Sequence, residues 1–200
     1  MYGDPLAPRT WMNDFAKNLI QFGLQQSPHE PTVYFMQGLL VIVFVDDIMY
    51  AGEPTKLNKL EKHVQQKYEG SFQLPLTDYL GFEIEKINNN LHLSQRKYIT
   101  KAMEEHNVVS RRVSSPLPGT LLVKDLEKGT LLENKKEYQA LMGSLNFVSL
   151  GTRPDVTFAV NLLARYQQTP TKETLSLAKR VLQYLNSTIQ LTLPMKPNFF

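Results

Sequence analysis

The sequence has no cysteine, one tryptophan and no long apolar run among its 200 residues. Without cysteine the chain forms neither disulfides nor thiolate metal sites, which fits a reducing compartment. A bilayer span needs about 20 consecutive apolar residues, and the amino-terminal MYGDPLAPRT lacks the apolar core of a signal peptide. These absences predict an intracellular protein of the cytoplasm, the nucleus or both, with no membrane partner.

Charge is unevenly spread along a chain of ordinary globular composition, 42% hydrophobic and 20% charged. Up to Asn90 there are 7 Lys and Arg against 11 Asp and Glu, whereas from Leu91 onward there are 15 against 8. An acidic first part could hold a metal ion, and a basic second part could bind a polyanion. Mildly basic surfaces are also common on proteins that bind no nucleic acid, so charge alone leaves both readings open.

Hydrophobic periodicity predicts an α+β fold that is β-rich early and helical late. Residues 39–45 are apolar at every position, which predicts a central strand covered on both faces. Ser94 is expected to cap the helix that follows it. Strands are predicted at 32–36, 39–45, 79–87 and 91–93, and helices at 8–22, 54–68, 95–106, 135–150, 154–167 and 171–185.

Asp46 and Asp47 follow the most apolar strand directly. Two unit charges about 5 Å apart repel by roughly 3 kcal/mol at an effective dielectric of about 20, so both side chains need either water or a cation. Asp is a favoured turn residue, and a solvated turn is the simpler reading. A turn that aims both carboxylates into one cleft would instead suit Mg²⁺, which prefers oxygen ligands and substrate phosphates.

Several blocks together favour the second reading. FVDDI resembles the catalytic box of reverse transcriptases, and its neighbours resemble, in order, the blocks of the copia-type (Ty/copia) retrotransposon branch of that family. The resemblance covers nearly the whole chain, and several blocks in one order are more specific than a lone pair of aspartates. The blocks are MYGDPLAPRTW, FVDDI, LGFEIEK, LHLSQRKYITKAM, SSPLP, YQALMGSLNFVSLGTRPDVTFAVNLLARY and AKRVLQYLNST.

The resemblance implies part of a right-hand polymerase. Residues 1–88 would be partial palm, 89–120 thumb-like and 121–200 a helical connection-like region. Asp46 and Asp47 would be the catalytic carboxylates that hold Mg²⁺ or Mn²⁺. A primer–template of RNA or DNA would be the partner, and the residues expected to contact it are Gly3, Arg9, Leu80, Gly81, Arg96, Lys97 and Lys101.

The sequence also departs from the family pattern. The first catalytic aspartate of the family lies in a DVxxAFL-type strand, and neither that strand nor the fingers is present. We therefore expect a truncated RNA-directed DNA polymerase that is inactive alone and holds its metal weakly. No carboxylate follows Glu173, so on ligand count we expect no RNase H activity from these residues. The alternative is a non-catalytic protein derived from a transposon, which binds nucleic acid, other polyprotein segments or its own copies.

Other polar residues have simpler interpretations. His29, His63, His92 and His106 are scattered without the spacing of metal ligands. The Arg153-Pro154-Asp155 segment matches a family block, and we expect it to start a helix and form a local ion pair rather than to take part in catalysis.

Overall fold

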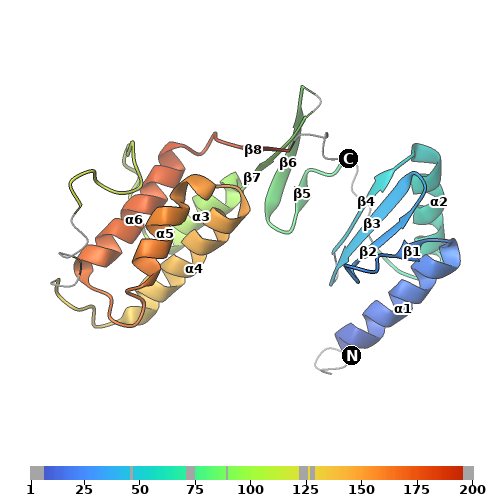
Figure 1. The fold of residues 1–200 in the computed structure, drawn as a ribbon, viewed down its shortest axis with the longest axis horizontal. Helices are drawn as coiled ribbons and strands as arrows, with labels where there is room; N and C mark the ends of the chain where they lie inside the picture. The colour runs from blue at the N-terminus through green and yellow to red at the C-terminus, as the bar shows by residue number, and fades with distance from the viewer. Residues whose placement is uncertain are drawn as a thin grey trace. The chain divides into compact units, whose positions relative to one another are not determined.

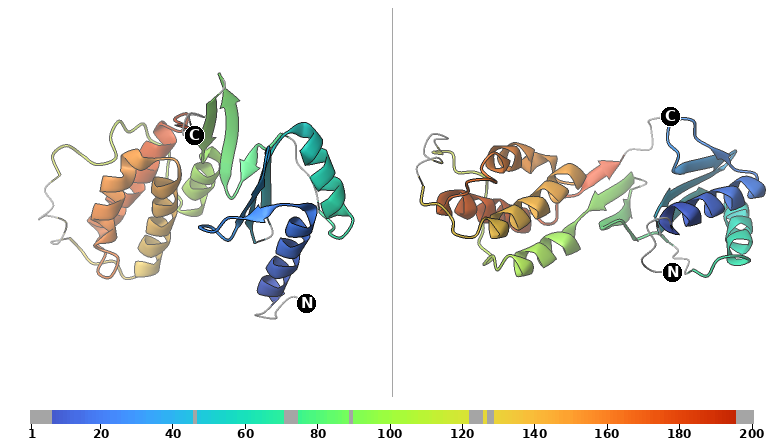
Figure 2. Two further views of the ribbon diagram at one scale, coloured as in Figure 1. Left: turned by 45° about the vertical axis from the view of Figure 1, so that its right-hand side comes forward. Right: turned by 90° about the horizontal axis from the view of Figure 1, so that it is seen from below.

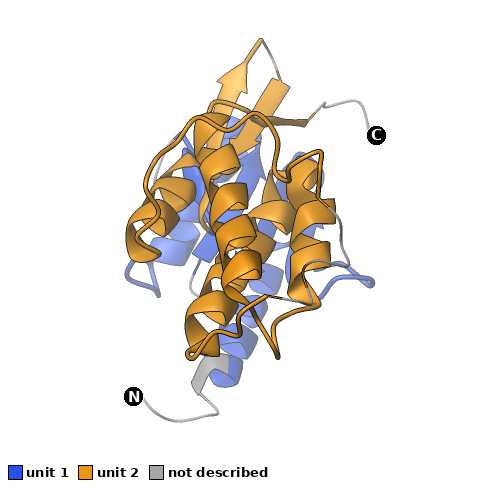
Figure 3. Ribbon diagram, turned by 90° about the vertical axis from the view of Figure 1, so that its left-hand side faces the viewer, with its two compact units in different colours: residues 1–80 blue, residues 81–200 orange. Residues whose placement is uncertain are grey.

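The computed structural model describes residues 7–45, 47–70, 75–88, 90–121, 126 and 129–195. It divides into two units, residues 1–80 and residues 81–200, which are coloured separately in Figure 3. Both contain antiparallel strands and helices, so the predicted α+β class is confirmed. None of the helices in the described ranges is both long and apolar enough to cross a membrane.

Unit 1 is built on an antiparallel sheet with the strand order β1-β2-β3-β4 (Figure 1). The predicted hairpin between the second and third strands is confirmed, because Met36 pairs with Leu39 across a turn in which Gly38 has a φ of 73°. The elements of the unit are α1 (Ala7–Phe22), β1 (Gln25–Gln26), β2 (Val33–Met36), β3 (Leu39–Phe44), β4 (Asp47–Gly52), α2 (Pro54–Gln65) and β5 (Asp78–Tyr79).

Only one face of the unit 1 sheet carries the core. Alternate side chains of β3 point to opposite faces, and those on one face pack with α1 and α2. The other face keeps Leu40 39% and Phe44 52% exposed. The prediction that this strand is covered on both faces is therefore wrong, because both helices pack on the same face. The buried core consists of Phe15, Leu19, Leu24, Tyr34, Leu39, Val41, Val43 and Leu60.

Unit 2 begins with an antiparallel hairpin, whose second strand also pairs with a strand near the end of the described chain. Helices follow, and α4, α5 and α6 pack side by side (Figure 2). The elements are β6 (Phe82–Ile87), β7 (Asn90–Ser94), α3 (Arg96–Glu105), α4 (Lys135–Gly151), the 3-10 helix η2 (Pro154–Val156), α5 (Thr157–Ala164), α6 (Lys172–Ser187) and β8 (Leu193–Met195).

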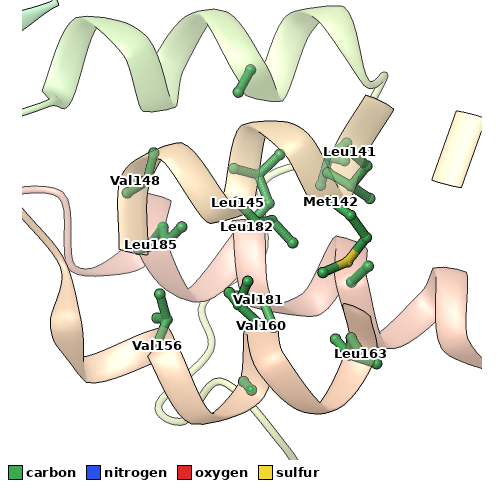
Figure 4. Close-up of a cluster of buried hydrophobic side chains, with 14 of the residues drawn as sticks. Leu141, Met142, Leu145, Val148, Val156, Val160, Leu163, Val181, Leu182 and Leu185 are labelled. Carbon is green, nitrogen blue, oxygen red and sulfur yellow. The ribbon is translucent and has the colours of Figure 1, made fainter. Parts of the chain in front are cut away.

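The core of unit 2 lies among its helices, as Figure 4 shows. The apolar faces predicted for α4 and α6 are confirmed by fully buried side chains, among them Leu145 and Leu185. The helix predicted for 154–167 is shorter and starts as a 3-10 turn. The ion pair expected there is confirmed, since the guanidinium of the buried Arg153 donates to Asp155 over 2.9 and 2.8 Å.

Two predictions at the start of unit 2 are wrong. The strand expected over 79–87 begins only at Phe82, because Leu80 and Gly81 have φ values of 50° and 82° and form a turn. Ser94 does not cap α3, since it is the last residue of β7 and its hydroxyl donates to Glu83.

Candidate functional site: a carboxylate turn in unit 1 and cations in unit 2

The turn that joins β3 to β4 has two residues. Phe44 pairs with Asp47, so only Val45 and Asp46 lie between the paired positions. Val45 has a φ of 52°. A β-branched side chain in this left-handed region is strained, at a cost of about 1 kcal/mol. Two-residue hairpins need such a φ to match the strand twist, so the pairing on either side holds the turn in place.

Asp47 is the first residue of β4 and is exposed to solvent. Directly paired residues of antiparallel strands share a face, which places Asp47 with Phe44 on the open face of the sheet. Burial raises the pKa of the Tyr79 hydroxyl, and the negative charge of Asp47 raises it further. An exposed carboxylate thus lies at the end of an apolar sheet face, where it is accessible to a cation.

Two of the predicted site residues, Gly3 and Asp46, lie outside the described residues. Within the described part of the chain, no group of three or more His, Asp or Glu side chains could hold a metal ion. Mg²⁺ does not need such a cage, because it keeps several waters and binds one or two carboxylates together with substrate phosphates. The carboxylate donor of Asp47 therefore fits a hard cation shared with a phosphate ligand.

A cavity of about 660 Å³ lies in unit 1 between the helices and β4. Its lining combines apolar side chains such as Trp11 and Phe15 with Asp47 and Asp78. Lys67 is the one cation among its lining residues, and its ammonium group already pairs with Asp14 at 2.7 Å. The described lining therefore offers no free cation for the phosphates of a nucleotide.

Arg9 is a predicted nucleic-acid contact in unit 1. It lies in α1 and is exposed. Leu80 and Gly81 lie at the junction of the two units in the turn described above, where Gly81 is exposed and Leu80 is half-buried.

Carboxylate partners are found for the predicted cations Arg96 and Lys101 of α3. Arg96 reaches both carboxylate oxygens of Glu85, at 2.6 and 3.4 Å. Lys101 pairs with Glu105 at 3.3 Å across one helical turn. Lys97 is exposed. Ion pairs of this kind must be broken or shared before the same cation can bind a phosphate, which reduces what α3 offers to a polyanion.

Sequence reasoning missed Glu83, which organises this end of α3. One oxygen of its carboxylate accepts hydrogen bonds from the backbone N–H groups of Arg96 and Lys97, at 2.6 and 3.2 Å. Negative charge at a helix N-terminus is favourable because the free N–H groups and the helix dipole are both positive there. The only available signal was a glutamate in the preceding strand, and the pattern of β6 does not reveal its target.

Comparison with known proteins decides the family. The sequence model of the family described as "Reverse transcriptase (RNA-dependent DNA polymerase)" matches residues 1–117. The chain belongs to the reverse transcriptase family. The resemblance inferred from the sequence blocks is thereby confirmed.

Pol polyproteins of copia-type transposons are among the relatives of this reverse transcriptase chain. The retrovirus-related Pol polyprotein from transposon RE1 of Arabidopsis thaliana is 33% identical over 195 residues, which is 94% of this chain. The Pol polyprotein from transposon TNT 1-94 of Nicotiana tabacum is 30% identical over 94% of the chain. The chain spans only 13% and 15% of their lengths. No solved structure matches it.

Proposed function

We propose that this chain supplies the metal-binding hairpin and a nucleic-acid-binding helical part to an RNA-directed DNA polymerase. The observation that carries the proposal is the strained two-residue turn between β3 and β4, which presents Asp47 on an open sheet face next to Asp46. Family membership supports this assignment. The corresponding division is partial palm for residues 1–88, thumb for 89–120 and connection for 121–200.

In this proposal Asp46 and Asp47 hold Mg²⁺, or Mn²⁺, together with phosphate oxygens of the nucleotide and the primer end. Divalent cations at such a site stabilise the attacking and leaving oxygens of phosphoryl displacement. The strained turn keeps Asp47 at the start of β4, beside an exposed apolar sheet face. The remaining predicted residues, Gly3, Arg9, Leu80, Gly81, Arg96, Lys97 and Lys101, contact the primer–template.

The 200-residue chain by itself does not extend primers in this proposal. Two-metal sites need more carboxylates than one pair provides, and Asp14, an acidic side chain of α1, is already engaged. Asp14 accepts hydrogen bonds from Lys67 and the Tyr68 hydroxyl at 2.7 and 2.6 Å, and the first of these does most to lower its pKa. A further carboxylate must then come from another polyprotein segment.

Metal binding tests the carboxylate assignment directly. Free Mn²⁺ is followed by electron paramagnetic resonance in the presence of a primer–template, for the full chain and its variants. Asp46→Asn and Asp47→Asn are each expected to weaken Mn²⁺ binding at least several-fold, whereas Glu30→Gln, an exposed carboxylate of the same unit that does not line the cavity, leaves it unchanged. Equal binding by all four proteins would exclude the assignment.

Primer extension tests the second part. With Mg²⁺ and nucleotides present, the chain alone is expected to give no product. Product that appears with the wild-type chain and disappears with Asp46→Asn would show that the two carboxylates suffice.

The open face of the unit 1 sheet favours a second candidate function, in which the chain is a non-catalytic binding protein. Phe35, Leu40 and Phe44 are 41%, 39% and 52% exposed on that face. Apolar surface of this kind is typical of an interface with another protein segment or with a second copy. A non-catalytic protein would bind primer–template or assemble in solution equally well after Asp46→Asn. Sedimentation and nucleic-acid binding of that variant separate the two functions.

A further inference from the structure

The segment that follows α3 is fixed along the C-terminal half of α6. Val108 and Val113 are buried, at 9% and 8% exposure, and they anchor the two ends of the segment 108–113. The side chain of Gln183 donates to the carbonyl of Val109 at 2.9 Å, and Asn186 donates to the hydroxyl of Ser110 at 3.0 Å. We call residues 108–113 the arginine loop, and it follows α3 in the yellow-green part of Figure 1.

Ser187 holds the centre of the arginine loop. Its hydroxyl donates to the carbonyl of Arg111 and accepts from the N–H of Val113, both at 3.0 Å. Arg111 and Arg112 lie between the buried anchors, and both are exposed. The backbone that carries the two guanidinium groups is therefore fixed, although the side chains themselves reach into solvent.

The two arginines have no carboxylate partner in the described part of the chain, unlike the cations of α3. Arg96 and Lys101 are paired with glutamates, and so is Lys179 of α6, which reaches Glu137 at 2.9 Å. No Asp or Glu occurs between Asn107 and Leu121, or in α6 after its first turn. The nearest carboxylates in the sequence are those of Glu104 and Glu105, and the second already pairs with Lys101.

A third guanidinium adds to this positive surface. Arg180 lies one turn before Gln183 on α6, and its Nη2 is 3.5 Å from the hydroxyl of Ser115, just beyond the arginine loop. Its Nε is buried without a hydrogen-bond partner. Three guanidinium groups thus lie on the loop and the helix surface below it, and none of the salt bridges among the described residues involves them.

We propose that Arg111 and Arg112 bind consecutive phosphate groups of a nucleic-acid strand. A guanidinium group is always charged and matches two oxygens of a phosphate with two parallel hydrogen bonds. Because the backbone is already fixed, less conformational entropy is lost on binding than for cations on a mobile loop. The partner class rests on the proposed function, but the site is independent of Asp46, Asp47 and the metal ion.

Fluorescence anisotropy with a labelled RNA–DNA primer–template tests the site in the full chain over a range of salt concentrations. Each phosphate contact contributes about 0.9 to the slope of log affinity against log salt. The double variant Arg111→Ala/Arg112→Ala is expected to bind about 10- to 100-fold more weakly at low salt, with a slope smaller by about 2. Circular dichroism confirms that each variant is folded.

The matched control removes the same charge elsewhere in unit 2. Lys135 and Lys136 are exposed at the start of α4, and Lys135→Ala/Lys136→Ala is expected to cost less than about 3-fold in affinity, because removal of a distant charge acts only through screened long-range attraction. Equal losses for the two double variants would overturn the site and leave general charge attraction as the explanation.

A positioning variant separates fixed geometry from charge. Ser187→Ala removes both central hydrogen bonds of the arginine loop and no charge, so affinity is expected to fall several-fold while the salt slope stays unchanged. Anionic phospholipid vesicles serve as the other source of phosphate. Loss of vesicle binding without loss of primer–template binding in the arginine variant would overturn the proposal. Failure of the wild-type chain to bind any primer–template would refute the proposed function itself, which is a different result.

Discussion

Unit 1 and unit 2 differ in what they leave uncovered. Unit 1 packs its helices on one face of a sheet, leaves the other face open and contains a β-branched residue at a φ of 52°. Unit 2 surrounds its core with helices, and the guanidinium of its buried Arg153 donates hydrogen bonds to Asp155 and Thr188. Under the proposed function, the less covered unit would present the metal site and the better packed unit would supply the cationic surface.

The largest expected effect comes from the two cores. Leu19 in unit 1 and Leu145 in unit 2 are both fully buried, and truncation of either to Ala should cost about 4 kcal/mol. Because the unit 1 core is smaller, we expect Leu19→Ala to abolish its cooperative unfolding, whereas Leu145→Ala only lowers the midpoint of unit 2. Trp11, the single tryptophan, reports on unit 1 by fluorescence, and circular dichroism reports mainly on the helices of unit 2.

If Leu19→Ala shifts the unfolding transition reported by Trp11 without abolishing it, unit 1 is more stable than its exposed face indicates. An unchanged transition would show that α1 does not pack on the sheet in solution.

The next effect concerns the ion pair between the buried Arg153 and the exposed Asp155 in unit 2. Arg153 is 2% exposed, donates to both oxygens of Asp155 and reaches the carbonyl and the hydroxyl of Thr188 at 3.2 and 2.6 Å. Asp155 is itself exposed and stays solvated without the guanidinium, but the carbonyls of Leu185 and Thr188 lose their donor, so Arg153→Met should destabilise unit 2 by about 2 kcal/mol. Urea unfolding measures this, with Arg165→Met, an exposed arginine of the same unit, as the control.

The pH dependence of unit 2 should follow the same pair. Burial raises the pKa of Asp155, but the hydrogen bond and the charge of Arg153, with the Tyr184 hydroxyl, outweigh it and bring the pKa below its ordinary value of 3.8. The unfolded chain then binds this proton more readily than the folded chain. The stabilisation is present above pH 3.8 and is lost as pH falls through the lower pKa of the folded state.

Asp155→Asn should therefore flatten the acid limb of a urea-midpoint profile for unit 2 and leave unit 1 unchanged. An acid limb that keeps its wild-type steepness in this variant would assign the pH dependence to other carboxylates.

A smaller effect is expected at the start of α3. Glu83→Gln weakens two hydrogen bonds to the helix N-terminus by removing their charge, and about 1 kcal/mol of unit 2 stability should be lost. Glu104→Gln changes a carboxylate in the last turn of the same helix, where negative charge is unfavourable, and should leave stability equal or slightly higher. Equal losses in both variants would mean that the carboxylate of Glu83 does not cap the helix.

The sequence predicted the local features of both units but not the contacts between residues far apart in the chain. The helices of both units were predicted within a few residues because their apolar spacing is set by the core that they cover. Leu80-Gly81 was mistaken for strand because LGFEI alternates as a strand does, and only the φ values reveal the turn. The partner of the α3 N-terminus lies 13 residues earlier, in another element, so no local pattern could indicate it.

For the candidate site, the sequence motif indicated which residues to consider but not the conformation of the turn that carries them. FVDDI identified the position of the two carboxylates, but the strain at Val45 depends on the pairing of Phe44 with Asp47 and is invisible in a run of β-favouring residues. The arginine loop was missed because adjacent arginines are common on surfaces. The feature that distinguishes them is their anchoring by α6, whose contributing residues lie about 75 positions away.

The smallest expected effect tests the strained turn. Val45→Gly removes the steric cost of the left-handed conformation, about 1 kcal/mol, and this roughly offsets the greater freedom of glycine in the unfolded chain. Unit 1 stability should stay within about 0.5 kcal/mol of the wild type. Val109→Gly, at an exposed loop position without positive φ, should lose about 0.5–1 kcal/mol from unit 2. A loss above 1 kcal/mol for Val45→Gly, followed by Trp11 fluorescence, would show that the turn is relaxed.

The pairing of β7 with β8 has a consequence for the order of events during synthesis. Leu91 of β7 pairs with Met195 of β8. The sheet of unit 2 therefore stays incomplete until β8, about a hundred residues later in the chain, has been synthesised. The unit 1 sheet uses only neighbouring hairpins and can close while translation continues. A nascent chain would therefore complete the unit 1 hairpins first, with one edge of β7 temporarily available to other strands.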